Sequence, residues 1–328
     1  MIMFWTAVLA STTLLYVLLA GFDLGVGVLF AFAKDEADRR RMLAAISPVW
    51  DGNETWLVLT GTILFGAFPL VYATLLSAFY LPLVVMLGAL IFSGVAFEFR
   101  FKAKIGFRWL WDVGFAGGSI VVSFVQGMTV GALARGLPVQ DGHYVGGTFG
   151  WYSPFALLCG AGLTLGYALL GAGWLVRKCD GPLRDRAYGY LAFLTAAVLA
   201  FLVVAFVYAL AMHFQIMGRW LERPYLLVFP LLGVYAAFSL LRGIKDKQDL
   251  LPFRMIALIF VTAFATLAIS FWPFMIPFSV TIDQAASPSS SLDFMFWGAG
   301  LFVLPLTIGY TAVVYRVFRG KVVEISFD

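Results

Sequence analysis

Residues 55–97 read TWLVLTGTILFGAFPLVYATLLSAFYLPLVVMLGALIFSGVAF, and these 43 residues include no Asp, Glu, Lys or Arg. A charge-free run of this kind is typical of the bilayer interior, where one helix needs about 20 residues. A single helix of this length would overshoot the membrane, so we expect two spans with a turn between Phe68 and Ser77. The stretch therefore predicts a membrane protein whose chain reverses within it.

The remaining sequence extends the same pattern. Hydrophobic residues make up 62% of the 328 residues and charged residues 12%, with a mean hydropathy of +0.93. A soluble domain has about 45 to 50% apolar residues. We expect an all-α polytopic membrane protein, a single integral membrane domain over residues 1–328 whose first span is not a cleaved signal peptide. The net charge of +4 lies in the connections and does not indicate nucleic-acid binding. Nine spans are predicted, near residues 5–33, 52–69, 75–97, 113–134, 152–176, 187–213, 224–241, 255–276 and 293–315.

Basic residues alternate between the two ends of the predicted spans. Of the 22 Lys and Arg residues, 19 fall in every second connection and in the C-terminal tail, and the other three are Arg135, Arg219 and Arg223. Because short cytoplasmic loops are enriched in Lys and Arg, the N-terminus is expected outside and the C-terminus in the cytoplasm. A missed span would break this alternation. The long outer connections, residues 136–150 and 277–292, are expected to be turn-rich connectors.

A faint internal repeat accompanies the spans. Three residues recur 146 positions later, namely Gly25, Gly27 and Arg40 as Gly171, Gly173 and Arg186. The repeat predicts two four-helix bundles, residues 1–135 and 150–276, plus one peripheral helix, residues 293–315.

Asp23 is the deepest carboxylate of the predicted spans. Ten residues separate it from Lys34, which places it about 15 Å along the first helix, near the middle of the bilayer. Gly21 and Gly25 permit close helix contact on either side of it. An acid at this depth is a candidate for a proton path, and a hydrogen-bonded Asp that locks helix packing is an equal alternative.

The segment Ser47–Trp56 brings two more carboxylates to a span. Ser47 and Pro48 are predicted to cap and begin a helix, so that Asp51 and Glu54 lie at its start, where the helix dipole favours acids. That preference explains them without a functional role. They are also three residues apart on one face, an arrangement useful for a proton relay, and we regard both as proton-path candidates. Trp50 and Asn53 are candidates for structural roles.

A second polar group is predicted at the cytoplasmic ends of the third and fourth spans. Glu98, Arg100 and Asp112 are expected to form a structural ion-pair set. The two histidines, His143 and His213, lie in or near outer connections, so we expect this chain alone to bind no haem and no metal; His213 beside Met212 is the one location worth checking.

Several segments spread over the chain resemble subunit II of cytochrome bd-type quinol oxidases. They are GFDLGVG (residues 21–27), PVWDGNETWL (48–57), FEFR (97–100), WD (111–112), MIPFSVTI (275–282), ASPSSSL (286–292) and YRVFRGK (315–321). The second segment is most similar to the cyanide-insensitive branch of the family.

The resemblance implies a haem-free, nine-helix subunit of the bacterial cytoplasmic (inner) membrane with no catalytic residue of its own. Its partner would be subunit I, which carries haems b and d and oxidises quinol, in a complex that reduces O2 to water. A structural quinone and a small single-span third subunit occur in some members. The resemblance also implies that Asp51, and less directly Asp23, serve a cytoplasmic proton-uptake path.

Two other functions are compatible with the same residues. Nine spans with a faint repeat and a mid-membrane Asp also occur in proton-coupled secondary transporters. A purely structural or assembly subunit, in which none of the carboxylates affects turnover, is the other alternative.

Overall fold

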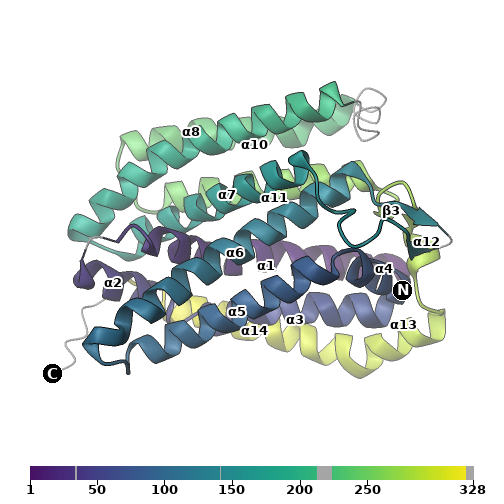
Figure 1. Ribbon diagram of the computed structural model, residues 1–328, viewed down its shortest axis with the longest axis horizontal. Coiled ribbons are helices and arrows are strands. Elements are labelled where there is room, and N and C mark those ends of the chain that lie inside the picture. The colour runs from purple at the N-terminus through teal and green to yellow at the C-terminus, as the bar shows by residue number, and fades with distance from the viewer. Residues whose placement is uncertain (34, 141, 213–223, 323–328) are drawn as a thin grey trace.

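Long helices that run nearly parallel to one another build the structure (Figure 1), a computed structural model that describes all residues except 34, 141, 213–223 and 323–328. The helices are α1 (Ile2–Phe30), α2 (Glu36–Ile46), α3 (Trp50–Ala67), α4 (Pro69–Ala78), α5 (Tyr80–Arg100), α6 (Arg108–Arg135), α7 (Pro154–Lys178), α8 (Gly181–Ala211), α10 (Val228–Lys245), α11 (Leu251–Phe271), α12 (Ile282–Ala285), α13 (Ser289–Met295) and α14 (Leu301–Val317). The short elements are two 3-10 turns (Ile105–Phe107 and Pro224–Leu227), a π-helical turn (Phe296–Gly300) and the strands β1 (Val139–Gln140), β2 (His143–Tyr144), β3 (Phe274–Ile276) and β4 (Val280–Thr281).

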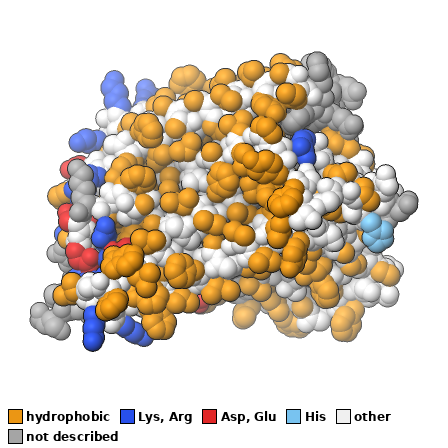
Figure 2. Space-filling model, in the orientation of Figure 1, with side chains coloured by type: hydrophobic (Ala, Val, Ile, Leu, Met, Phe, Trp, Pro, Cys, Tyr) orange, Lys and Arg blue, Asp and Glu red, His pale blue; other side chains and the backbone are white. Residues whose placement is uncertain are grey.

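The described helices confirm the predicted all-α polytopic membrane fold. Eight helical segments are long and apolar enough to cross a membrane, and the bent pair α3 and α4 can supply a ninth. Figure 2 shows apolar side chains over the middle of the molecule and Lys, Arg, Asp and Glu gathered mainly at one end, where α2 lies. The apolar band matches a bilayer, and the charged end matches one aqueous surface.

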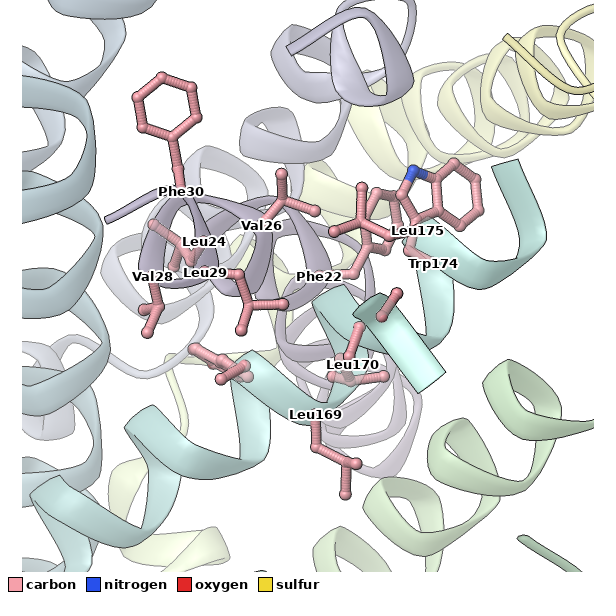
Figure 3. Close-up of a cluster of buried hydrophobic side chains, with 14 of the residues drawn as sticks. Phe22, Leu24, Val26, Val28, Leu29, Phe30, Leu169, Leu170, Trp174 and Leu175 are labelled. Carbon is pink, nitrogen blue, oxygen red and sulfur yellow. The ribbon is translucent and has the colours of Figure 1, made fainter. Parts of the chain in front are cut away.

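Helices α1 and α7 approach each other very closely. A Cβ placed on Gly25 would lie 1.7 Å from the backbone oxygen of Tyr167, and one on Gly171 would lie 2.4 Å from the carbonyl carbon of Gly25. Only glycine allows two helix backbones to approach this closely. Just beyond the contact Phe22 and Trp174 stack with ring centroids 4.2 Å apart, inside the apolar cluster of Figure 3.

The repeat glycines occupy matching environments. Gly25 and Gly171 meet each other, while Gly27 packs on Ser119 of α6 and Gly173 on Ile256 of α11, the last helix of each proposed half. Equivalent residues touch across a two-fold axis, so this pattern supports the division into two similar halves, which stays a proposal.

The charge-free stretch reverses direction at the predicted position, but a short helix replaces most of the predicted turn. The chain bends by 118° between α3 and α4, at Phe68-Pro69, because proline cannot continue a helix and restricts the residue before it. Residues up to Ala78, expected as a turn, instead form helix α4, and α5 begins at Tyr80. The apolar side chains of α4 pack into a second buried cluster and favour helix over loop.

The two long connections at the end opposite α2 contain hairpins that were not predicted. Strand β1 pairs with β2, and β3 pairs with β4. The second hairpin leads through α12, whose Thr281 and Gln284 form a capping box, to Ser287, which bonds to the carbonyls of Gly66 and Ala67 at the end of α3. The carbonyls released by the helix break are satisfied in this way.

The glycine contact yields a stability prediction. Gly25→Ala places a methyl group against the α7 backbone, which cannot rotate away as a side chain could, so the change should destabilise the folded protein by about 3 kcal/mol or more. Gly189→Ala in α8, where no atom lies within 4 Å of the added Cβ, is the matched control and should leave stability unchanged or raise it by up to about 1 kcal/mol. Thermal unfolding of the purified protein measures both, and equal melting temperatures would contradict the packing argument.

Candidate functional site

The candidate site is built on Asp23, which lies at the level of the α1–α7 contact. All residues of α1 from Ala20 to Phe30 are buried, and the side chain of Asp23 is 8% exposed. One carboxylate oxygen, Oδ2, accepts a hydrogen bond of 2.6 Å from Asn53 Nδ2, and the other, Oδ1, has no partner within the described protein. Burying a carboxylate with one unsatisfied oxygen destabilises the folded protein, so its presence indicates that Asp23 has a role beyond packing.

Asn53 joins three helices at this point. Its amide nitrogen donates to Asp23 and, at 3.3 Å, to the carbonyl of Leu19, both on α1, while its Oδ1 accepts a 2.8 Å hydrogen bond from the Tyr315 hydroxyl on α14. Asn53 is 1% exposed. The result is a continuous hydrogen-bonded chain from Tyr315 through Asn53 to Asp23.

A cavity of about 260 Å³ opens beside Asp23 between α1, α3, α5 and α6. Its polar lining consists of Asp23, Glu54, Ser93 and Ser119, and its apolar lining includes Trp50. A water molecule occupies about 30 Å³ in the liquid, so the cavity has room for several waters. The two carboxylates therefore face one space that water can fill.

A second polar chain links α1, α6 and α7 next to this site. Gln126 Nε2 donates to the Tyr16 hydroxyl at 2.6 Å, and the Tyr167 hydroxyl donates to Gln126 Oε1 at 2.9 Å. Both tyrosines interact electrostatically with Glu54. Sequence reasoning missed this chain, although a single glutamine in the apolar span of α6 is the kind of residue that signals an interhelical hydrogen bond.

The carboxylates predicted near the start of the second span separate in the structure. Glu54 is half-buried and lines the cavity, whereas Asp51 is exposed and does not. The predicted cap at Ser47 is wrong: Ser47 ends α2, and α3 begins at Trp50 without a side-chain cap. The reason is that residues 36–46 form a separate helix, capped at its own start by Asp35, which continues in helical geometry into Ser47.

The charged end of the bundle is organised around Arg100, whose side chain is 2% exposed. It forms ion pairs with Asp112 and with Glu36 Oε2, the latter at 2.8 Å. Glu98 is exposed and makes no ion pair within the described residues, so it does not join the predicted set, because it lies on the other face of α5. Four further members come from α2 and the start of α6 and were not predicted, namely Glu36, Arg39, Arg40 and Arg108.

Of the two histidines, one can be placed. His143 is exposed in β2 at the far end from Arg100, and His213 lies outside the described residues, beyond Met212, which is exposed. In the described part of the chain no three His, Cys, Asp or Glu side chains gather as metal ligands, and no buried histidine offers an axial position for haem.

Comparison with known proteins identifies the family. The sequence profile described as Cytochrome bd terminal oxidase subunit II matches residues 1–318. The chain belongs to the cytochrome bd terminal oxidase subunit II family. The prediction from the sequence segments is therefore confirmed, and the protein is a multi-pass subunit of an oxidoreductase complex of the bacterial cytoplasmic membrane.

Individual relatives of this subunit II support the assignment over nearly the full length. The chain is 33% identical to the probable cytochrome oxidase subunit 2 of Haemophilus influenzae, with 92% of this chain and 89% of the relative covered. It is 30% identical to the cytochrome bd-I ubiquinol oxidase subunit 2 of Escherichia coli (94% and 91%) and 31% identical to the cytochrome bd ubiquinol oxidase subunit 2 of Bacillus subtilis (97% and 96%).

The fold of subunit II is also shared with a solved structure. A chain of the bd oxidase structure from Geobacillus thermodenitrificans superposes with a TM-score of 0.75 at 15% identity, covering 97% of this chain and 98% of that one. At that identity the likeness concerns the fold.

The Arg100 cluster gives a pH prediction. Burial by itself would raise the pKa of Glu36, but hydrogen bonds from Arg100 and Arg40 and the charges of Arg100 and Arg108 outweigh it and hold the pKa below 4.5, its ordinary value. A carboxyl with a lowered folded-state pKa stabilises the fold above its ordinary pKa, and this stability is lost as pH falls through the lowered value. Glu36→Gln should therefore destabilise the subunit at pH 7. Below about pH 4.5 the melting temperature of the variant should fall less steeply with decreasing pH than that of the parent. Melting curves of variant and parent over this range that stay parallel would contradict the prediction.

Proposed function

We propose that this subunit II carries protons from the cytoplasm toward the oxygen-reducing centre of the complex through Glu54, the water-accessible cavity and Asp23. Two observations on Asp23 support the proposal. Asp23 lines the same cavity as Glu54, and one oxygen of its buried carboxylate has no hydrogen-bond partner within the described protein. Reduction of O2 to water consumes protons inside a low-dielectric membrane protein, and carboxylates linked by water can deliver them there.

The electron chemistry in this proposal belongs to the partner. Two relatives are named as ubiquinol oxidase subunits, and we place haems b and d and the oxidation of quinol in subunit I. Haems supply the one-electron and O2 chemistry when bound there. This chain contributes the polar path and a packing surface. A structural quinone and a small third subunit stay predictions of the resemblance.

The exposed face of α3 is a candidate contact surface for subunit I. Asp51, Thr55 and Thr62 are exposed along one side of a helix that crosses the apolar band, together with Val58 and Phe65. An ionised Asp facing lipid within the apolar band is costly, so a partner protein is favoured over lipid on this face. Asp51, which interacts electrostatically with Glu54, would then lie at the boundary between the subunits, at the entrance of the path.

Asp23→Asn tests the path. The substitution preserves size and can still accept the hydrogen bond from Asn53, but it cannot exchange a proton, so O2 consumption by the assembled complex with quinol should fall at least about tenfold. Haem absorption of the complex should remain normal. Asp293→Asn, an exposed acid in α13, is the matched control and should retain full turnover.

The same experiment separates the alternatives. Loss of haem in Asp23→Asn would mean that Asp23 acts in packing, and full turnover would mean that Asp23 is not on the proton path. Full turnover of the Asp23, Asp51 and Glu54 variants alike would mean that subunit II is structural only. A transporter would instead be a colourless chain that accumulates a solute without consuming O2.

Asp51→Asn and Glu54→Gln test the order of the path. Because Glu54 lines the cavity and Asp51 does not, Glu54→Gln should lower turnover more than Asp51→Asn, again with haem content unchanged. Oxygen-electrode measurements on purified complexes decide the order. A larger loss in Asp51→Asn would contradict this order and would mean that the path continues from Asp51 outside the cavity.

A further inference from the structure

The segment after α14 is fastened to the end of α7 by a buried lysine. Lys178 is 5% exposed, and its ammonium donates to the carbonyl oxygens of Phe318 at 2.5 Å and of Gly320 at 2.7 Å. The backbone N–H of Val322 in turn donates to the carbonyl of Lys178 at 2.8 Å. Within the described chain no carboxylate pairs with Lys178, so its charge is directed at the carbonyls that end α14. A cation at a helix C-terminus is stabilising.

This attachment matters because α14 is otherwise weakly held. None of its residues is buried, Pro305 interrupts its hydrogen bonds, and a π-helical turn precedes it. A helix with so few interior contacts depends on its ends and on specific polar contacts for its orientation. The residue whose orientation matters is Tyr315, which donates to Asn53.

Lys178 and Tyr315 are close enough to be coupled. Phe318, whose carbonyl Lys178 binds, lies three residues after Tyr315, within one helical turn. The Lys178 ammonium lies 5.4 Å from the ring centre of Trp174, and that ring contacts the Tyr315 ring at 6.1 Å between centroids. Fixing the end of α14 therefore fixes the turn from which the Tyr315 hydroxyl reaches Asn53.

We propose that Lys178 is a positioning residue for the Asp23 site, which acts by holding the end of α14 so that the Tyr315 hydroxyl stays on Asn53. The inference rests on the proposed proton path. Tyr315 keeps the Asn53 amide oriented with its N–H groups toward Asp23 and Leu19, and an Asn53 that rotates would present its oxygen to the carboxylate instead.

Three variants of the assembled complex test the proposal, each measured as kcat and KM for quinol. Tyr315→Phe removes the hydroxyl and should lower kcat about fivefold, the equivalent of one net hydrogen bond, with KM unchanged because quinol binds elsewhere. Lys178→Gln should produce the same loss, and Lys178→Arg, which keeps a cation at the carbonyls, should restore kcat to within about twofold. In the double variant Lys178→Gln with Tyr315→Phe, kcat should be no lower than in Tyr315→Phe alone, because the two residues act through one contact.

Lys321 provides the matched control. It also fastens the tail, through an ion pair with Asp180 and one of 2.8 Å with Asp249, but it is partly exposed, and such pairs contribute little. Lys321→Gln should retain the parental kcat. If Lys178→Gln does not assemble, Val322→Pro replaces it, since it removes the N–H bonded to Lys178 while keeping the lysine.

The outcomes separate this inference from the proposed path. Full activity of Lys178→Gln, additive losses in the double variant, or failure of Lys178→Arg to restore kcat would overturn the positioning role while leaving the Asp23 result intact. Full activity of Asp23→Asn and Tyr315→Phe together would overturn the path itself.

Discussion

The structure depends on the contact between the backbones of α1 and α7 at Gly25 and Gly171. That contact joins α1 and α7 through main-chain atoms and leaves no room for a side chain. The contact also fixes the direction in which the neighbouring α1 side chains point. Once one turn of a helix is held in place, the helical period sets the orientation of the side chains before and after it. Asp23, two residues before Gly25, is in this way directed toward α3 and the cavity.

Around this fixed carboxylate the polar groups come from helices that are far apart in sequence. Asn53 approaches from α3 and Tyr315 from α14, while Gln126 of α6 bonds to Tyr16 of α1 and Tyr167 of α7. Hydrogen-bonded groups in a low-dielectric interior strengthen one another, and each also restricts the rotamer of the next. The site therefore combines Asp23, held rigidly on α1, with polar side chains on other helices, whose positions depend on how those helices pack.

The sequence predicted those features that depend on composition and local chemistry. Charge-free runs gave the spans, and the break at Phe68-Pro69 followed from proline geometry. The depth of Asp23 in the bilayer stays a prediction. Contacts between distant segments were not predictable, because Asn53 and Tyr315 are 262 positions apart and no periodic pattern links them. Local signals also misled where tertiary structure intervened: Ser47 resembled a helix start but ends α2, and Glu98 lies one helical face away from the ion pairs that Arg100 forms. Assignment to the cyanide-insensitive branch stays a prediction.

The place of Tyr315 in the chain has a consequence for biosynthesis. Residues 23 and 53 leave the ribosome well before residue 315, and the carbonyls held by Lys178 follow residue 315. Helices made first enter the membrane first, so the polar pair of α1 and α3 is complete long before the helix that supplies its third partner. A chain that stops before α14 would retain the α1–α7 contact and its apolar core but leave Asn53 without the hydroxyl that orients it. The end of α14 thus completes a site that begins in α1.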